Sequence, residues 1–358
     1  MSQGSVLVPL RLERAEEEAA LLEYSMRTSR GAVYLHCTGP AASSPPTTAT
    51  LDYLTHCLEP SAHGMPRCDV FPLMPCMGWS AERVAERLTD VEEVVAAAEH
   101  AGDCHALVDL INESRQRAGL PSVSLTLTAG HQEAGDAASG EPPQQPDGGG
   151  SVGGSRGGSA DGQLPQQQQQ QGDGMGGAGG PPVPRSRVIG DWPSPVLQFS
   201  KVAVGGTFDR LHAGHRLLLA ATALLATRSI FVGITADALL ATKKNRALLE
   251  GYAEREAAAV GYMQVVNPEA TVVAGPLTNP KEPPLCAVDP EFDAIVVSEE
   301  TVPGAHAINQ TRAELGFPPL VIVVVGLIYS RRRAAKLSST DLREEDAAGA
   351  ASGSPAPR

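Results

Sequence analysis

Two histidines three residues apart, preceded by a pair of glycines, are the residues of this chain best suited to chemistry. They lie in residues 202–215, whose sequence is VAVGGTFDRLHAGH. Gly205 and Gly206 let the backbone turn sharply and approach a ligand closely. A helix that begins after this turn would favour an anion at its N-terminus, and His212 and His215 would share one face of its first turn. The segment predicts a phosphate-binding site that supplies hydrogen-bond donors and no nucleophile.

A second polar segment, residues 336–343, has the sequence KLSSTDLR. Its hydroxyl groups, on Ser338, Ser339 and Thr340, can cap a helix or bind phosphate. Arg343 follows one turn later and could grip the same anion. Taken alone, this pattern favours an ordinary capped helix near the C-terminus.

The two histidines could instead be part of a metal site. No third histidine or well-spaced carboxylate follows them on the expected helix, so the sequence disfavours zinc. The histidines and cysteines of residues 1–128 are irregularly spaced. We interpret them as buried thiols and surface imidazoles.

The elements that must position these residues alternate along the C-terminal half. The predicted strands are residues 199–204, 229–235, 271–274, 294–298 and 320–326, and the predicted helices are residues 213–226, 253–266 and 305–315. Strands that alternate with helices indicate a parallel, Rossmann-like α/β sheet with helices on both faces. Ligands bind at the carboxyl ends of such strands. The glycine pair follows a predicted strand, as this rule requires.

Composition divides the chain into four parts. Residues 1–128 predict a small α/β region, with helices at 81–98 (capped by Ser80) and 105–117 and strands at 32–37 and 122–128. Residues 129–195 are rich in Gly, Pro and Gln and have too few apolar residues for a core, which predicts a flexible linker. Residues 196–346 are the predicted Rossmann-like domain that carries both polar segments, and residues 347–358 a disordered tail.

Charge and cysteine content limit the partners. The net charge is −13 over 358 residues, and so acidic a chain is poorly suited to nucleic acid. The six cysteines include no CxxC pair, and residues 1–22 do not resemble a targeting signal. Both observations predict reduced thiols and a cytoplasmic location. The apolar run at 320–329 is half of the ~20 residues that span a membrane, so we expect a buried strand and no membrane partner.

The string GGTFDRLHAGH resembles the signature of the HxGH nucleotidylyltransferase superfamily. KLSSTDLR resembles the superfamily's ISSTxxR-type signature, in the form typical of eukaryotic phosphopantetheine adenylyltransferases. Residues 294–301 (AIVVSEET), 307–312 (AINQTR) and the lysine-bearing region 239–255 are similar to further family segments. The resemblance covers about residues 202–343, is nearest to plant and algal enzymes, and does not extend to residues 1–195.

The resemblance implies transfer of AMP from ATP to 4′-phosphopantetheine, which yields dephospho-CoA and pyrophosphate in coenzyme A biosynthesis. In-line attack needs no covalent enzyme intermediate, so positioning and charge stabilisation would supply the catalysis. Mg²⁺ is expected as the partner of ATP. The chain has no GxxxxGK[ST] motif, so a separate dephospho-CoA kinase is expected.

The family's functional roles can be carried onto single residues. His215 would stabilise the transferring phosphate, His212 would hold the triphosphate, and Lys243 (with Lys244 as the near alternative) would contact the incoming phosphate. Thr207 would touch both substrates. The resemblance thus implies His215, Lys243 and Thr207 as the catalytic residues. The full ATP-binding set would be Gly205, Gly206, Thr207, Phe208, His212, His215, Asn309, Arg312, Ser338, Ser339, Thr340 and Arg343. The phosphopantetheine-binding set would be Thr207, Asp209 and Lys243.

Two positions depart from the family pattern, and two other functions remain open. Pro303 stands where animal relatives have an arginine, and Asn279 where many relatives have an aspartate. One alternative function is a cytidylyltransferase acting on an alcohol phosphate, whose C-terminal string usually resembles RTxGIST. The other is a non-catalytic nucleotide sensor, which the intact histidines disfavour. Residues 1–128 are predicted to mediate association or regulation.

Overall fold

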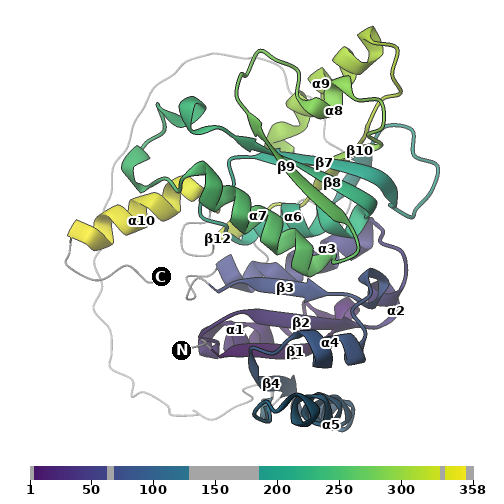
Figure 1. The fold of residues 1–358 in the computed structure, drawn as a ribbon, viewed down its shortest axis with the longest axis vertical. Helices are drawn as coiled ribbons and strands as arrows, with labels where there is room; N and C mark the ends of the chain where they lie inside the picture. The colour runs from purple at the N-terminus through teal and green to yellow at the C-terminus, as the bar shows by residue number, and fades with distance from the viewer. Residues whose placement is uncertain (1–3, 63–67, 129–184, 331–334, 352–358) are drawn as a thin grey trace, which may run out of the picture. The chain divides into compact units, whose positions relative to one another are not determined.

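The computed structural model describes residues 4–62, 68–128, 185–330 and 335–351. The strands of these residues form two large sheets and one short two-stranded ribbon (Figure 1). The ribbon pairs β12 (Tyr329–Ser330) with β13 (Ala335–Lys336). Each large sheet belongs to one half of the chain and has its own helices.

The N-terminal sheet has five parallel strands in the order β3-β2-β1-β4-β5. The strands are β1 (Ser5–Arg11), β2 (Val33–Thr38), β3 (Val70–Leu73), β4 (Val91–Ala97) and β5 (Ser124–Thr128). The α-helices are α1 (Ala19–Thr28), α2 (Pro40–Ser43), α3 (Thr48–Leu58), α4 (Ala81–Arg87) and α5 (Ala101–Ala118). The first half is therefore α/β, like the second.

The C-terminal sheet has six strands in the order β6-β11-β10-β7-β8-β9. The strands are β6 (Arg187–Ile189), β7 (Phe199–Gly206), β8 (Ala226–Thr235), β9 (Thr271–Leu277), β10 (Ala294–Ser298) and β11 (Val321–Val325). Only the edge strand β6 runs antiparallel. The α-helices are α6 (Ala213–Leu225), α7 (Tyr252–Val266), α8 (Leu285–Val288), α9 (Val302–Glu314) and α10 (Ser339–Ala351). The Rossmann-like fold class is confirmed.

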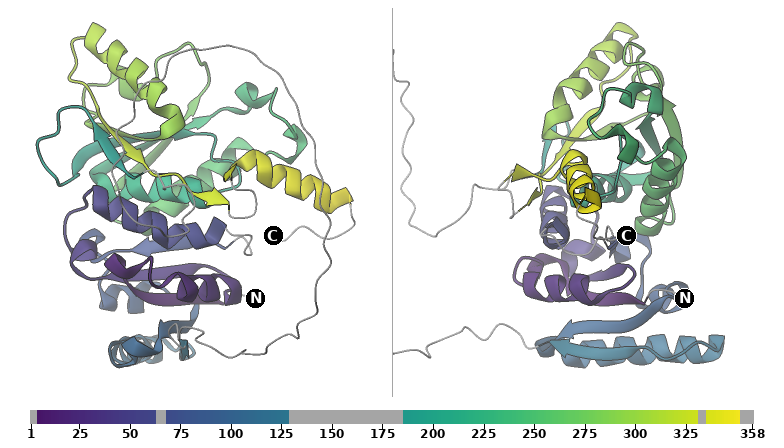
Figure 2. Two further views of the ribbon diagram at one scale, coloured as in Figure 1. Left: turned by 180° about the vertical axis from the view of Figure 1, so that it is seen from behind. Right: turned by 90° about the vertical axis from the view of Figure 1, so that its left-hand side faces the viewer.

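Helices cover both faces of the C-terminal sheet (Figures 1 and 2). Neighbouring residues of the central strands join different apolar clusters, because alternate side chains of a strand point to opposite faces. Val296 packs in the cluster that contains α6 and α7, whereas Ile295 and Val297 pack with α8 and α9. The valine-rich β11 is buried on both faces in the same way, as expected for a parallel strand.

Helix α6 lies deepest in the C-terminal half. It packs against β7, β8 and β10 and also against α3 and α7. Leu217, Leu219, Ala220 and Leu224 are all buried, and a helix that is apolar all round needs partners on every side. This packing on all sides holds α6 in place, and with it the turn that joins α6 to β7.

The helix predicted over residues 81–98 is wrong in its second half. Helix α4 ends at Arg87, and residues 91–97 form β4, the strand between β1 and β5. The apolar spacing fits a helix, but the β-branched valines pair with strands on both sides, and this pairing overrides the helical period. Ser80 caps α4 as predicted, because its hydroxyl accepts a hydrogen bond from the backbone N–H of Arg83.

Two predicted boundaries also differ from the structure. Strand β6 falls inside the predicted linker, where Val188 pairs with Val323 of β11. Helix α10 continues to Ala351, inside the predicted tail. Residues 129–184 and 352–358 lie outside the described residues. Within the part of the chain that the structure describes, no helix combines the length and apolar character that a membrane crossing requires.

Candidate active site

A cavity of about 260 Å³ opens at the carboxyl ends of β7, β10 and β11. Residues that directly follow each of these strands line it, together with the start of α10. The polar side chains of the lining are those of Thr207, His212, His215, Lys243, Ser298, Glu300, Thr301, Ser338, Ser339, Thr340 and Arg343. The position agrees with the rule that parallel sheets bind ligands at their carboxyl edge.

The turn between β7 and α6 is held in an unusual backbone conformation. Phe208 and Arg210 have positive φ angles of 52° and 49°, which side chains other than glycine seldom adopt. The ring of Phe208 is fully buried and meets the ring of His215 edge-on, with 5.5 Å between centroids. Strain of this kind persists where surrounding packing imposes it, and it is common at functional sites.

The two histidines stand at the N-terminus of α6. His212 is the N-cap, and its Nδ1 accepts a hydrogen bond from the backbone N–H of His215 at 3.4 Å. The imidazole rings stack with 3.9 Å between centroids. Because Nδ1 of His212 is an acceptor here, its Nε2 carries the proton in the neutral form. The pair and the 13-residue helix behind it form a site suited to an anion.

The N-terminus of α10 faces the same cavity. Ser338 caps this helix: its hydroxyl accepts from the backbone N–H of Asp341 at 3.3 Å and donates to the Asp341 carboxylate at 2.7 Å. Ser339 and Thr340 line the cavity beside it. Two helix N-termini therefore converge on one space, which favours a polyanionic ligand such as a triphosphate.

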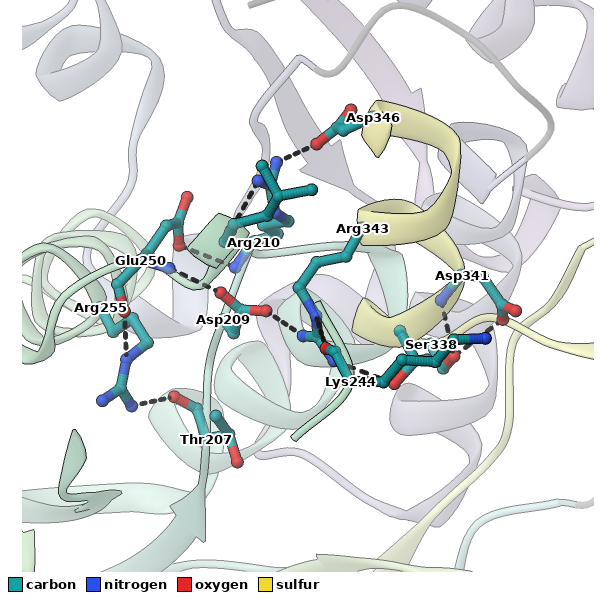
Figure 3. A network of polar contacts seen from close by, with 12 residues as sticks. Thr207, Asp209, Arg210, Lys244, Glu250, Arg255, Ser338, Asp341, Arg343 and Asp346 are labelled. Atoms are coloured by element: carbon teal, nitrogen blue, oxygen red, sulfur yellow. Dashed lines mark hydrogen bonds and ion pairs between the residues drawn. The ribbon is translucent and has the colours of Figure 1, made fainter. Parts of the chain in front are cut away.

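A buried ion pair joins α10 to the turn after β7 (Figure 3). The carboxylate of Asp209 is fully buried and bonds the guanidinium of Arg343, which is only 2% exposed. Asp209 also accepts from the backbone N–H of Glu250 at 3.0 Å. The guanidinium further donates to the carbonyl of Lys244 and the hydroxyl of Thr340.

This ion pair changes two of the predicted roles. Asp209 does not line the cavity, so the structure does not place it against phosphopantetheine. Arg343 does line the cavity, but three of its donor groups are already used by the protein. Its first task is to neutralise Asp209 and to dock α10.

Arg210 fastens α10 a second time. Its guanidinium pairs with Asp346 and donates to the carbonyl of Leu248, and its backbone N–H donates to the carboxylate of Glu250 at 2.7 Å. The side chain thus ties the strained turn to two other segments (Figure 3).

Arg255, for which the sequence predicted no role, holds the backbone of Thr207 in place. The side chain is fully buried, and its guanidinium donates to the carbonyls of Thr207, Glu250 and Thr235 and to the Asp237 carboxylate. The hydrogen bond from Arg255 lowers the pKa of Asp237. The sequence feature that could have indicated this role is the segment 239–255, which is similar to a family segment and ends at Arg255.

The lysines of the loop before α7 differ in position. Lys243 lines the cavity, whereas the ammonium of Lys244 lies 2.7 Å from the carboxylate of Glu344 on α10. Between the two alternatives that the sequence left open, the structure brings Lys243 to the site.

Asn309 and Arg312, two of the predicted ATP contacts, do not line the cavity. The amide of Asn309 bonds the backbone of Leu320 in both directions. Arg312 is fully buried, and its guanidinium donates to five backbone carbonyls, those of Cys286, Asp289, Pro290, Phe292 and Pro318. Both side chains hold the fold around α8 and α9 together.

Neither of the two residues that depart from the family pattern lines the cavity. Pro303 occupies the first turn of α9, where a fixed φ suits the helix. Asn279 shapes its own turn, since its side chain bonds the backbone N–H of Lys281 and the carboxylate of Glu282.

Known proteins match the half of the chain that holds this site. A family model described as cytidylyltransferase-like matches residues 203–345. The phosphopantetheine adenylyltransferase of Methanopyrus kandleri is 39% identical over 152 residues, which cover 42% of this chain and 94% of that protein. The chain belongs to the phosphopantetheine adenylyltransferase family. A second archaeal member, from Pyrococcus furiosus, is 36% identical and is matched over 88% of its length.

The phosphopantetheine adenylyltransferase of Saccharomyces cerevisiae is 36% identical over 154 residues. The match covers 42% of this chain and 50% of the yeast protein, so the chain spans about half the length of that relative. A solved structure, of a protein of unknown function from Archaeoglobus fulgidus, is 35% identical and covers 35% of this chain and 88% of its own, with a TM-score of 0.30.

Proposed function

We propose that this chain transfers AMP from ATP to 4′-phosphopantetheine and releases dephospho-CoA and pyrophosphate, a step of coenzyme A biosynthesis. One observation carries the proposal: the N-termini of α6 and α10, with His212, His215 and Lys243, line a single cavity. Membership in the phosphopantetheine adenylyltransferase family supports these substrates. A separate dephospho-CoA kinase would consume the product.

The proposed chemistry is one in-line displacement. A phosphate oxygen of phosphopantetheine attacks the α-phosphorus of ATP, and the bond to the β-phosphate oxygen breaks as pyrophosphate leaves. His215 would donate to the oxygens on which charge grows, and Lys243 would hold the attacking phosphate. Preorganised donors of this kind stabilise a transition state without needing a nucleophile.

The remaining lining groups would bind the triphosphate. His212 and the hydroxyls of Ser339 and Thr340 lie at the two helix N-termini, where the β- and γ-phosphates would be held. Thr207, fixed through its carbonyl by Arg255, would lie beside the reacting phosphate. Burial and the strained turn keep these groups in place before substrate arrives.

Mg²⁺ fits this site as a partner of ATP. Among the described residues, no cluster of three or more His, Cys, Asp or Glu could cage a metal ion. The lining offers the Glu300 carboxylate and several hydroxyls, a set that suits an ion which also takes phosphate oxygens. When bound, Mg²⁺ would neutralise charge on the leaving pyrophosphate.

The six unpaired cysteines support action in a reducing compartment such as the cytoplasm.

The test is pyrophosphate release with pairs of substrates. The full-length chain is incubated with Mg²⁺ and ATP or CTP, together with 4′-phosphopantetheine or an alcohol phosphate. We expect release only when ATP and 4′-phosphopantetheine are both present. Release from CTP with an alcohol phosphate would overturn the proposal in favour of a cytidylyltransferase. Binding of ATP without release from any pair would overturn it in favour of a nucleotide sensor.

A further inference from the structure

The two large sheets share one topology. In order of appearance along each half, the strands of the N-terminal sheet are arranged 3-2-1-4-5, and the parallel strands of the C-terminal sheet, β9-β8-β7-β10-β11, follow the same order. In each half the first strand leads through a short turn into a helix that packs near the sheet centre. That turn is residues 12–18 after β1 and residues 207–212 after β7.

The N-terminal turn does not carry the functional residues of its counterpart. Its sequence is LERAEEE, and the N-cap of α1 is Glu18, where α6 has His212. The Glu18 carboxylate is 6% exposed and lies 3.5 Å from Nε2 of His100 in the segment after β4. The turn holds four glutamates and one basic residue, Arg14, so its net negative charge would repel a triphosphate. The N-terminal sheet therefore has the layout of a nucleotide site without the means to bind one.

This sheet contacts the two helices that carry and support the active site. Tyr262 of α7 donates its hydroxyl to the backbone carbonyl of Val70 at 2.9 Å and stacks on Phe71, with 5.1 Å between centroids. The indole of Trp79 donates to the carbonyl of Val265 at 2.9 Å. These contacts are buried or partly buried, so they fix the orientation of α7.

One contact reaches the first turn of α6. The guanidinium of Arg216, the residue after His215, lies 2.6 Å from the carboxylate of Asp69, just before β3. The Arg216 side chain is 7% exposed and the Asp69 side chain 55%. A cation near a helix N-terminus is disfavoured by the helix dipole. The Asp69 carboxylate compensates that charge. The ion pair also links the first turn of α6, which carries His215, to the N-terminal sheet.

We propose that the N-terminal half is a non-catalytic copy of the nucleotidylyltransferase fold, which positions the first turn of α6 through the Asp69–Arg216 ion pair. Asp69 is a positioning residue, because it acts through Arg216 and does not line the cavity. The inference rests on the proposed function, since it names what holds His215 in place during that reaction.

The experiment compares two ion pairs that join the same two halves. Asp69→Asn removes the pair beside His215. Glu269→Gln removes the pair of Glu269 with Arg83, whose 2.6 Å separation is the same and whose carboxylate is similarly exposed, at 64%. Steady-state kcat and KM for ATP are measured in the full-length chain, with the melting temperature as a check on folding. The double variant Asp69→Arg/Arg216→Asp restores an ion pair with reversed charges.

We expect Asp69→Asn to lower kcat by roughly 10- to 100-fold with KM for ATP changed less than about threefold, because a small displacement of a catalytic group lowers the rate more than substrate binding. Glu269→Gln should leave both constants unchanged, and the charge-reversed pair should recover part of kcat. Unchanged kcat in Asp69→Asn, or an equal loss in Glu269→Gln, would overturn the positioning role. A wild-type chain without activity would instead contradict the proposed function.

Discussion

At the scale of single residues, substitution of His215 tests the proposed reaction most directly. Its ring is held between Phe208 and His212 at the end of a helix, and it lines the cavity. His215→Ala should lower kcat by about 100- to 1,000-fold, the usual loss on removing one transition-state donor. Steady-state kinetics, with circular dichroism to verify the fold, measure this. A loss below about tenfold would remove His215 from the catalytic role.

Substitution of Asp209 is expected to lower the stability of the folded chain. Because both partners of the Asp209–Arg343 pair are buried, Asp209→Asn would leave an uncompensated guanidinium and should reduce the free energy of unfolding by about 3–5 kcal/mol. Urea denaturation measures the change. Replacing both residues, as Asp209→Asn/Arg343→Met, should be less destabilising than Asp209→Asn alone. Additive losses would contradict the pairing.

Glu18 predicts a pH-dependent effect. Burial raises the pKa of this carboxyl above its ordinary 4.5, so the folded chain holds the proton more tightly than the unfolded chain. Stability contributed by the protonated form is lost as pH rises through the folded pKa. Glu18→Gln should therefore raise the melting temperature at pH 7, and the gain should shrink below pH ~4.5. A destabilised variant at pH 7 would show that the contact with His100 outweighs the cost of burial.

At the scale of elements, α10 closes the cavity. Its only cap identified among the described residues is the Ser338 hydroxyl, and loss of such a cap costs about 1 kcal/mol of helix stability. Ser338→Ala should raise KM for ATP several-fold, whereas kcat at saturation changes less, since α10 would contact phosphates that do not react. Titration of ATP in the steady state decides this. A fall in kcat at constant KM would place Ser338 at the reacting phosphate instead.

The helices and strands also show which parts of the fold could be predicted from the sequence. The five parallel strands of the C-terminal sheet and helices α6, α7 and α9 could be predicted, because short β-branched runs alternate with longer segments along this half of the chain. Strand β6 and helix α8 were not predicted. The helix over residues 81–98 was wrong in its second half because the valines at 91, 94 and 95 have helical spacing, and only their pairing with β1 and β5 makes this segment a strand. Asn309 and Arg312 matched a family segment, but spacing cannot reveal that backbone carbonyls surround a guanidinium.

At the scale of the whole molecule, two sheets of the same strand order serve one cavity. The C-terminal sheet supplies the turn, the histidines and the two helix N-termini. The N-terminal sheet holds α6 and α7 from the other side through Asp69, Val70 and Trp79. The strand order of the two sheets is the same, but the turns after β1 and β7 differ in sequence, so the sequence alone does not reveal the shared topology.

In the proposed reaction, this cavity transfers an adenylyl group to a phosphate ester of pantetheine. The most direct measurement uses ATP labelled in the α-phosphate, with 4′-phosphopantetheine, Mg²⁺ and the full-length chain, and follows the label by chromatography and mass spectrometry. We expect the label to appear in dephospho-CoA in an amount equal to the pyrophosphate released. Pyrophosphate release with the label remaining in free AMP, or no conversion while phosphopantetheine binds, would contradict it.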